Sequence, residues 1–412
     1  MRHLKLHRLI AAIGMTMWVL TACGHPSPAT SAAVSADGSN VQETVVPLRT
    51  GAEQTEKYIP LLKGKRVALL SNHTGMVGDR HTLDIMLDSG INVTTIFSPE
   101  HGFRGTADAG EHVSSSVDKA TGIPIASLYS GKSRYPAKSV MDSIDIIVTD
   151  IQDVGLRFYT YYCTMIDLMN ASARYGKEFM ILDRPNPNGM TVDGPVLDMK
   201  YASGVGRLPI PVLHGMTLGE LAQMAIGEGW LTDSAVVPLT VIPVEGYTHS
   251  TRYELPVAPS PNLPDMKAVY LYPSLCFFEA TPVSVGRGTD QPFHIYGHPA
   301  MKGRGYSFTP TSRPGAKNPP LLGKLCYGEN LTSVPDSIII SQGVNLEYLI
   351  DAYNALGSGD RFFTSFFEKL IGNSKVRRQI EQGMSAEEIK ESWQPEVEAF
   401  REQRAPYLLY PE

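Results

Sequence analysis

Short apolar runs alternate with stretches of helical spacing through the first half of the chain. The apolar runs lie at 66–70, 93–97, 123–128, 144–149 and 178–182. Helical periodicity is clearest at 82–90 and 159–175. Nearly all-apolar strands that alternate with helices are typical of a parallel sheet covered on both faces. We therefore predict an α/β fold with a Rossmann-like parallel-sheet domain over 55–212.

The pattern changes beyond Pro211. Thr217 and Glu220 have the spacing of a capping box, which predicts a helix from this point. The remainder combines a strand-like run, a stretch rich in proline, glycine and aromatic residues, and a mostly helical end. These parts lie at 237–244, 256–320 and 346–400. We predict a smaller α+β ancillary domain over 213–412.

The first residues have the charge order of a secretory signal. Arg2, Lys5 and Arg8 precede an apolar stretch at 9–20, which is shorter than the about 20 residues of a membrane-spanning helix. The stretch ends in Leu-Thr-Ala-Cys23, and this ending resembles the bacterial lipobox, in which the cysteine is lipidated. We expect a lipoprotein signal peptide over 1–22; the alternative is a plain signal peptide with an incidental cysteine.

Small and polar residues follow Cys23 and predict a flexible tether over 23–54. A lipid on Cys23 would tether the protein to a membrane without spanning it. We therefore expect secretion through the inner membrane and a lipid-anchored protein in the periplasm, on a membrane that the sequence does not identify.

Charge and cysteine content exclude several classes of protein. The net charge of −6 over 412 residues argues against a nucleic-acid partner or a polybasic membrane surface. Cys163, Cys276 and Cys326 are far apart in the chain, so there is no CxxC site, and three buried thiols are favoured over a disulfide framework. The oligomeric state is left open.

Polar residues follow four of the predicted strands. In an open parallel sheet, ligands bind outside the carboxyl ends of the strands. The candidate site residues at these ends are Asn72, His73, Glu100, His101, Arg104, Asp150, Gln152, Arg157, Asp183, Arg184 and Asn186. The alternative is that these loops are simply polar and that some of the residues cap helices or, like Asp150, form turns.

Common cofactor motifs are absent from the sequence. The first strand is not followed by GxGxxG, and neither GxxxxGK[ST] nor GxSxG nor HExxH occurs. His73, Glu100, His101 and Asp150 could in principle assemble a metal site, but hydrolytic zinc usually shows a clearer ligand spacing. We expect no cofactor and no metal.

With these motifs absent, the remaining interpretation is acid–base chemistry by carboxylates on a polar substrate. Glycoside cleavage needs a carboxylic acid that protonates the leaving oxygen, and Glu100 suits this role if Phe103 helps to desolvate it and raise its pKa. His101 or Asp150 could orient Glu100. Spacing alone does not assign these roles.

Substrate binding could use the other strand-end residues. Arg104, Arg157 or Arg184 could hold a substrate carboxylate in bidentate fashion. Asn72, Gln152 and Asn186 suit sugar hydroxyl and amide groups.

A second polar cluster lies beyond residue 270. Glu279 stands among aromatic residues, and Gly286 and Gly288 would let the backbone at Arg287 approach a ligand closely. The alternative is a structural aromatic core with a capped turn. In the functional interpretation, Glu279, Arg287 and Asp290 lie across a cleft from Glu100, and nearby tyrosine and phenylalanine rings stack on the face of a sugar.

Six motifs, by their order along the chain and their residues, together resemble those of a known family. They are Asn-His-Thr-Gly at 72–75, Pro-Glu-His-Gly-Phe-Arg-Gly at 99–105, Asp-Ile-Gln-Asp-Val-Gly-Leu-Arg-Phe-Tyr at 150–159, Asp-Arg-Pro-Asn-Pro-Asn-Gly at 183–189, Leu-His-Gly at 213–215, and Glu-Ala-Thr at 279–281 with Gly-Arg-Gly at 286–288. Residues 55–410 resemble the NamZ family of exo-β-N-acetylmuramidases, formerly a domain-of-unknown-function family of secreted bacterial proteins.

The resemblance implies a Rossmann-like domain plus an ancillary domain, with the active site in the cleft between them. It implies release of N-acetylmuramic acid from the non-reducing ends of peptidoglycan fragments, with Glu100 as the catalytic residue. The lactyl carboxylate of this sugar is an independent reason for arginines at the site. Its acetamido group could serve as an internal nucleophile, and direct attack by water is the other route.

Two further functions are left open by the sequence. A lipid-anchored protein that binds cell-wall fragments without cleaving them would use the same aromatic and arginine side chains. A metal-dependent peptidoglycan amidase or deacetylase would be inactivated by a chelator.

Overall fold

The computed structural model describes residues 46–99, 103, 116–128, 135–357 and 359–412. These residues belong to one compact unit that begins at Val46. The expected signal peptide over 1–22, Cys23 and most of the expected tether lie outside the described residues. Within the described ranges, no helix is both long and apolar enough to cross a membrane.

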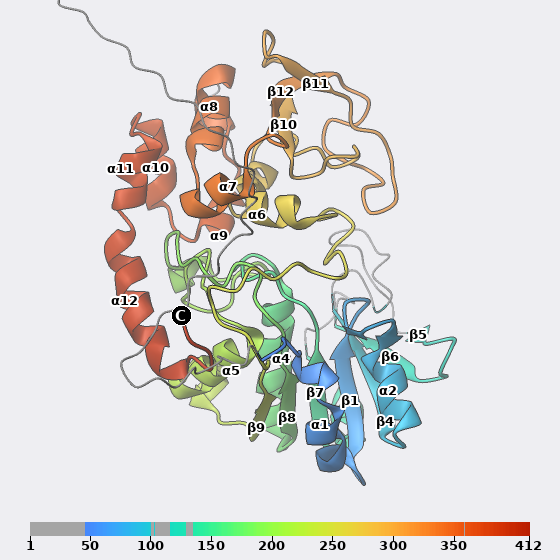
Figure 1. Ribbon diagram of the computed structural model, residues 1–412. Helices are drawn as coiled ribbons and strands as arrows, with labels where there is room; N and C mark the ends of the chain where they lie inside the picture. Colours follow the sequence, from blue (N-terminus) through green and yellow to red (C-terminus); the bar gives the residue numbers. More distant parts are fainter. Residues whose placement is uncertain (1–45, 100–102, 104–115, 129–134, 358) are drawn as a thin grey trace, which may run out of the picture. The chain divides into compact units, whose positions relative to one another are not determined.

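A seven-stranded sheet forms the centre of the first region, with the strand order β5-β6-β4-β1-β7-β8-β9 (Figure 1). All neighbouring strands are parallel except β5, which pairs with β6 in the antiparallel direction. The strands are β1 (Arg66–Ser71), β4 (Asn92–Ser98), β5 (Ser116–Val117), β6 (Pro124–Ser127), β7 (Ile146–Asp150), β8 (Glu178–Leu182) and β9 (Leu239–Ile242). The predicted parallel sheet is therefore confirmed, apart from the antiparallel edge strand β5.

Helices cover both faces of this sheet. Val67 and Leu69 of β1 pack into the core with α1 and α2, whereas Ala68 and Leu70 pack into the core with α4 and α5. This alternation follows from the two-residue period of a strand. The helices are α1 (Thr55–Leu62), α2 (Thr82–Asp88), α3 (Lys138–Asp142), α4 (Tyr161–Tyr175) and α5 (Leu218–Gly227). A short hairpin of β2 (Met76–Val77) and β3 (Arg80–His81) lies between β1 and α2.

Strand β1 is the point at which the strand order reverses. The chain proceeds from β1 to β4 and β6 on one side, and then returns to β7 on the other side of β1. In the register of this pair, Ser71 at the end of β1 is the partner of Asp150 at the end of β7. The loops that leave β1 and β7 therefore start next to each other, where doubly wound folds usually bind ligands.

The sheet extends past residue 213. Strand β9 pairs with β8 from Leu239 to Ile242, so the expected boundary between residues 212 and 213 falls between two neighbouring strands of one sheet. The apolar run of β9 resembles any buried strand, and its sequence does not specify which sheet it joins.

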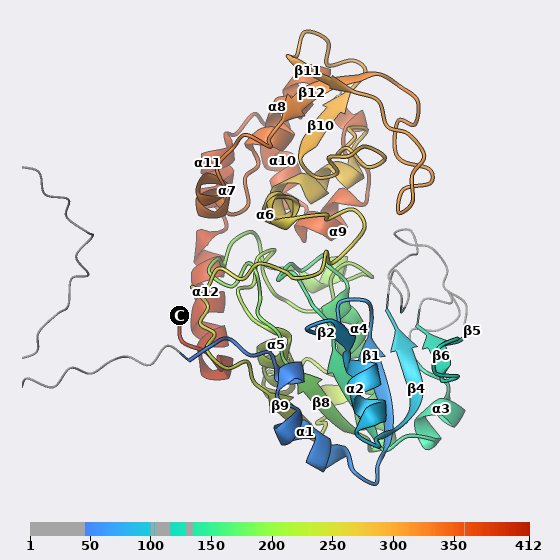
Figure 2. The same ribbon diagram turned by 45° about the vertical axis from the view of Figure 1, so that its right-hand side comes forward.

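The C-terminal region (266–404) contains a three-stranded antiparallel sheet and several helices (Figure 2). The strands are β10 (Ile295–His298), β11 (Tyr306–Phe308) and β12 (Cys326–Asn330), in the order β10-β12-β11. The helices are α6 (Met266–Leu275), α7 (Asp336–Gln342), α8 (Glu347–Leu356), α9 (Phe367–Ile371), α10 (Lys375–Glu381), α11 (Ala386–Glu391) and α12 (Gln394–Arg404). The short 3-10 helices are η1 (Gly51–Glu53), η2 (Met199–Tyr201), η3 (Thr232–Ser234), η4 (Cys276–Ala280), η5 (Gly359–Arg361) and η6 (Ala405–Tyr407).

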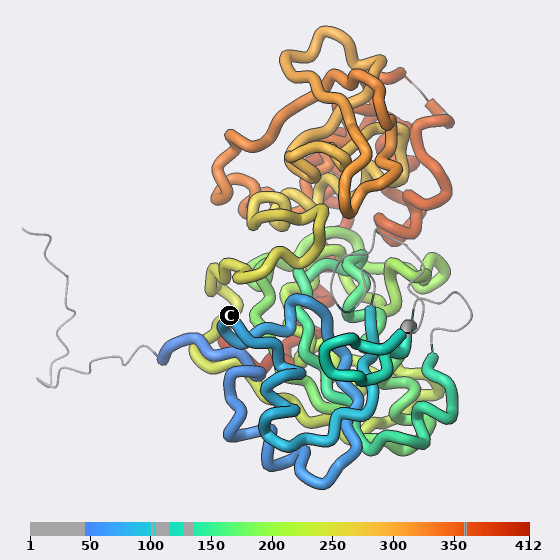
Figure 3. The backbone as a smooth tube through the Cα atoms, turned by 90° about the vertical axis from the view of Figure 1, so that its right-hand side faces the viewer, coloured from blue at the N-terminus to red at the C-terminus, as the bar shows by residue number. Residues whose placement is uncertain are grey.

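The end of the chain returns to the first region (Figure 3). The Tyr410 hydroxyl donates to Asp183 Oδ2 at 2.6 Å, and the backbone N–H of Leu409 donates to Glu220 Oε1 at 2.8 Å. Glu220 also completes the predicted capping box with Thr217, which is confirmed. The three cysteines Cys163, Cys276 and Cys326 are buried free thiols, as favoured from the sequence.

Candidate active site

The loops that follow β1 and β7 are hydrogen-bonded to each other. The hydroxyl of Thr74 donates to Asn72 Oδ1 at 2.6 Å and accepts the backbone N–H of Gln152 at 3.0 Å. The amide Nε2 of Gln152 donates to the carbonyl oxygens of Asp153 and Pro185, both at 2.8 Å. Asn72 and Gln152 are buried. These two residues were expected to bind substrate, but their hydrogen bonds connect the loops to each other instead.

Asp150 and Arg184 form a buried ion pair at the same edge of the sheet. Arg184 donates through Nε to Asp150 Oδ1 at 2.6 Å and through Nη2 to Oδ2 at 3.0 Å. Oδ2 also accepts the hydroxyl of Thr82. Asp150 has no exposed surface, so the carboxylate expected to act in catalysis holds Arg184 instead. We call Asn72, Thr74, Asp150, Gln152 and Arg184 the strand-end cluster.

The chain crosses this cluster very closely at Gly75. A Cβ atom at this position would lie 2.2 Å from Ser71 Oγ and 3.2 Å from Asp150 Oδ2. Any other residue would therefore collide with the ends of β1 and β7. The space in which doubly wound folds often bind a ligand is occupied here by the protein itself.

Arg157, another strand-end candidate, forms hydrogen bonds only within the described protein. Arg157, which has no exposed surface, donates to the carbonyl oxygens of Pro195, Ile210 and Leu370 at 2.6–2.9 Å, and burial lowers its pKa to about 10. Arg157 was expected to bind substrate, but in the structure it connects distant segments of the chain through buried hydrogen bonds.

Asp183 and Asn186 likewise bind backbone and side-chain groups of the fold. Asp183 accepts Thr217 Oγ1 at 2.7 Å and Gly219 N–H at 3.0 Å, and burial raises its pKa to about 6 despite these bonds. Asn186 donates to the carbonyl oxygen of Met216 at 3.0 Å. Both residues are buried, which argues against direct contact with a substrate.

His73 connects the sheet to a different site. Its Nε2 lies 2.9 Å from the carbonyl oxygen of Ala258. The next carbonyl oxygen, that of Pro259, accepts the hydroxyls of Tyr159 and Tyr161 at 2.8 and 3.2 Å. The segment that begins at Ala258 then continues into the wall of a cavity.

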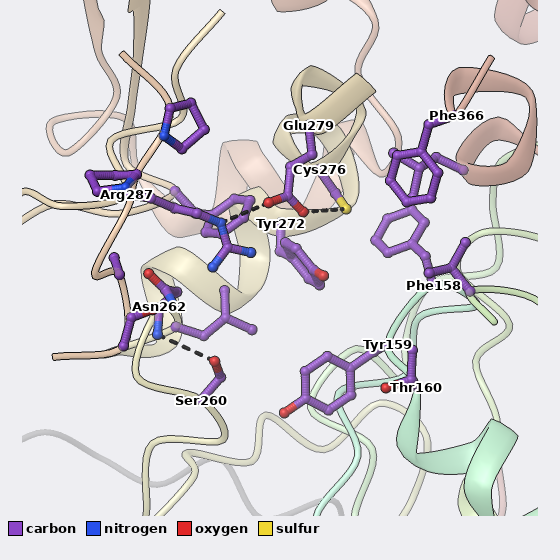
Figure 4. Close-up of a pocket in the computed structure, with 18 of the residues that line it drawn as sticks. Phe158, Tyr159, Thr160, Ser260, Asn262, Tyr272, Cys276, Glu279, Arg287 and Phe366 are labelled. Carbon is purple, nitrogen blue, oxygen red and sulfur yellow. Dashed lines mark hydrogen bonds and ion pairs between the residues drawn. The ribbon is translucent and has the colours of Figure 1, made fainter. Parts of the chain in front are cut away.

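This cavity has a volume of about 570 Å³ and lies between the loop that precedes α4 and the C-terminal region (Figure 4). It is lined by Phe158, Tyr159, Thr160, Tyr161, Val205, Ser260, Asn262, Leu263, Tyr272, Cys276, Glu279, Arg287, Phe293, Gly315, Ala316, Lys317, Asn318, Pro319, Pro320, Phe366 and Leu370. Its size and its mixture of aromatic and polar walls are typical of a small-molecule site.

Glu279 and Arg287, both expected from the sequence, lie together in the cavity wall. Arg287 Nε donates to Glu279 Oε1 at 2.7 Å, and the thiol of Cys276 lies 3.6 Å from Glu279 Oε2. Burial opposes the charged form of Arg287, but the neighbouring carboxylate of Glu279 favours it, and the pKa of Arg287 is raised overall. We call Glu279 and Arg287 the pocket pair.

Aromatic rings form much of the remaining wall. Tyr272 packs edge-to-face against Phe158 and Phe293, with ring centroids 5.3 and 4.8 Å apart. Tyr159 is held by its hydroxyl on Pro259. Such rings offer flat apolar surfaces for the face of a sugar. Tyr159 was not predicted as a site residue, whereas tyrosine and phenylalanine rings near Glu279 were expected to stack on a sugar, and Tyr272 is one of the rings that line the cavity.

Glu100, His101 and Arg104 lie outside the described residues. In the sequence they follow Ser98, the last residue of β4, and flank Phe103. Phe103 is buried, with its ring 5.1 Å from that of His81 in an edge-to-face contact. Among the described residues, no group of three or more His, Cys, Asp or Glu side chains is arranged to hold a metal ion.

Two family models cover most of the described chain. The N-terminal model of exo-β-N-acetylmuramidase NamZ matches residues 67–267, and the C-terminal model matches residues 270–410. The chain belongs to the NamZ family. The two NamZ models meet within the first turn of α6, and Tyr272, which α6 contributes to the cavity, belongs to the C-terminal part. The cavity therefore has walls from both NamZ parts.

Related proteins support the same assignment. The peptidoglycan β-N-acetylmuramidase NamZ of Bacillus subtilis (strain 168) is 36% identical over 407 residues, covering 92% of this chain and 96% of that protein. A crystal structure of a DUF1343 family protein from Bacteroides fragilis NCTC 9343 is 58% identical, with a TM-score of 0.84 and coverage of 89% of this chain and 99% of that chain. A second such structure from the same organism is 27% identical, with a TM-score of 0.75 and coverage of 88% and 99%.

Proposed function

We propose that this protein is a peptidoglycan β-N-acetylmuramidase that acts from the non-reducing end and releases N-acetylmuramic acid. The observation that carries the proposal is the match to the muramidase of Bacillus subtilis along nearly the whole of both chains. The cavity between the two NamZ parts supports it, because its aromatic rings and the pocket pair suit a sugar that bears a carboxylate.

In this proposal, Glu100 is the general acid. It protonates the glycosidic oxygen as the bond to the anomeric carbon breaks, so that the leaving sugar departs as an alcohol. Its place in the sequence supports this role, because β4 ends at Ser98 beside β1 in the sheet. His101 is proposed to orient Glu100, and Arg104 to bind substrate.

We further propose that the mature protein is a lipoprotein, anchored through Cys23 and located in the periplasm. The support is the order of basic, apolar and lipobox-like residues at the start of the sequence. Replacing Cys23 with Ser should abolish incorporation of labelled palmitate and move the protein from the detergent phase to the aqueous phase. Labelling that persists in the variant would contradict the anchor.

The function is tested by incubating the protein with a disaccharide that has muramic acid at its non-reducing end. The expected product is free N-acetylmuramic acid, with or without a chelator. Binding of the disaccharide without any cleavage would indicate a binding protein, and loss of cleavage in the chelator would indicate a metal enzyme.

Glu100→Gln should lower kcat by about 100-fold or more, because the amide cannot donate a proton to the leaving oxygen. Glu178→Gln is a matched control, since Glu178 begins β8 at the opposite edge of the sheet and its side chain is 48% exposed. Release of muramic acid from a chromogenic glycoside measures both variants. Near-normal activity of Glu100→Gln would remove Glu100 from the acid role.

A further inference from the structure

Arg287 is held by one of its nitrogens and leaves two others available. Its Nε donates to Glu279 Oε1, whereas Nη1 and Nη2 form no hydrogen bond with any residue that the structure describes. The side chain is 15% exposed, and Figure 4 shows the guanidinium group extending into the cavity, on the side that faces Tyr159. Two parallel N–H donors thus point toward the space that a ligand would occupy.

We propose that Arg287 is the receptor for the lactyl carboxylate of N-acetylmuramic acid, which its Nη1 and Nη2 bind in bidentate fashion. The inference rests on the proposed function and names the residue that distinguishes muramic acid from a sugar without the lactyl group. A guanidinium is planar and presents its donors in a rigid fork that matches a carboxylate.

Two other arginines expected to bind this carboxylate, Arg157 and Arg184, are engaged elsewhere. The Nη1 and Nη2 atoms of Arg157 are bonded to three backbone carbonyl oxygens. Arg184 binds both oxygens of Asp150. Neither side chain lines the cavity, whereas Arg287 does.

Glu279 acts on the substrate through Arg287 and is therefore a positioning residue. Its carboxylate fixes Nε, and the ring of Phe293 lies 5.1 Å from the guanidinium carbon on another side. The pocket pair carries no net charge, so its own contribution to recognition depends on two directed hydrogen bonds rather than on long-range attraction. A sugar without the carboxylate would leave both donors unpaired in a partly dry site.

The test compares Arg287→Gln and Arg287→Lys with the wild-type full chain. The readouts are kcat and KM on a chromogenic N-acetylmuramic acid glycoside, and inhibition by free N-acetylmuramic acid and by its lactyl methyl ester. Arg304→Gln is the control, because Arg304 lies in the same region but both of its Nη atoms are bonded to Glu329 and Asp351.

In the wild type, the acid should inhibit more strongly than the ester. Arg287→Gln should lower kcat/KM by about 10- to 100-fold, mostly through KM, and should be inhibited equally by acid and ester. Arg287→Lys should be intermediate, because it keeps the charge and loses the fork. Arg304→Gln should behave as the wild type.

A preference for the acid that persists in both Arg287 variants would overturn the role of Arg287. Absence of muramic acid release by the wild type would instead contradict the proposed function. Circular dichroism identifies a variant that has not folded; if Arg287→Gln fails in this way, Arg287→Lys decides, and unchanged discrimination in that variant counts against the proposal.

Discussion

The strand-end cluster and the pocket pair both contain a carboxylate and an arginine, yet they differ in what remains available to a ligand. Asp150 and Arg184 bind each other in a place without solvent access, next to a glycine that leaves no room for another group. Glu279 and Arg287 share one hydrogen bond, and the other guanidinium nitrogens face a cavity. Residue types therefore do not identify a site; donors and acceptors that are unused and also face an open cavity do.

The largest expected effect is at the strand-end cluster. Asp150→Ala should lower the free energy of unfolding by about 3–5 kcal/mol, because it leaves the guanidinium of Arg184 buried without its partner. Urea denaturation measures the loss. Asp88→Ala, which removes the exposed partner of Arg80, should have no measurable effect. An Asp150→Ala variant that keeps its stability but loses activity would show that Asp150 acts in function rather than in stabilising the fold, which would contradict this distinction between the two regions.

A second prediction concerns Asp153, which follows the cluster directly. Burial raises the pKa of Asp153 from 3.8 to about 7, so the folded protein binds a proton here more tightly than the unfolded chain does. The stability that this group confers is present below pH 4 and is lost as the pH rises toward 7.

Asp153→Asn should therefore gain stability relative to the wild type between pH 4 and pH 8, by on the order of 2–4 kcal/mol. Chemical denaturation of both proteins across this range measures the difference, and the subtraction removes the other titrating groups. A difference that does not change with pH would mean that Asp153 titrates normally in the fold.

The smallest stability effect is expected at the pocket pair. Glu279→Gln and Arg287→Gln should change the free energy of unfolding by no more than about 1 kcal/mol, because both side chains are partly exposed to the cavity. Their effect should fall on substrate binding instead. Thermal denaturation of both variants, compared with their kinetics, distinguishes an effect on stability from an effect on substrate binding. A loss of stability as large as that of Asp150→Ala would mean that the pocket pair serves mainly to stabilise the fold.

Much of the fold was predictable from local pattern. Each apolar run between residues 66 and 182 became a strand of the sheet, and the Thr217 capping box begins α5. The antiparallel sheet of the C-terminal region was not predicted. β12, for example, contains a glycine and polar residues, and its pairing with β10 and β11 is formed by contacts with other strands rather than by its own pattern.

The candidate site residues were likewise predicted only in part. Glu279 and Arg287 were predicted and lie together in the cavity. Asp150, Arg157 and Asp183 were also predicted but are bonded within the protein. Their position after a strand is the same as that of a ligand-binding residue, so sequence position could not distinguish the two uses.

The sequence by itself determined the parallel sheet, the helices that cover it and the motifs that the NamZ family shares, because these depend on periodicity and on residue order. Only the tertiary structure decided which polar groups remain available to a substrate. A hydrogen bond such as that from Arg157 to Leu370 joins residues 213 positions apart. Whether a buried donor finds such a partner depends on how distant segments pack, and local pattern does not contain that information.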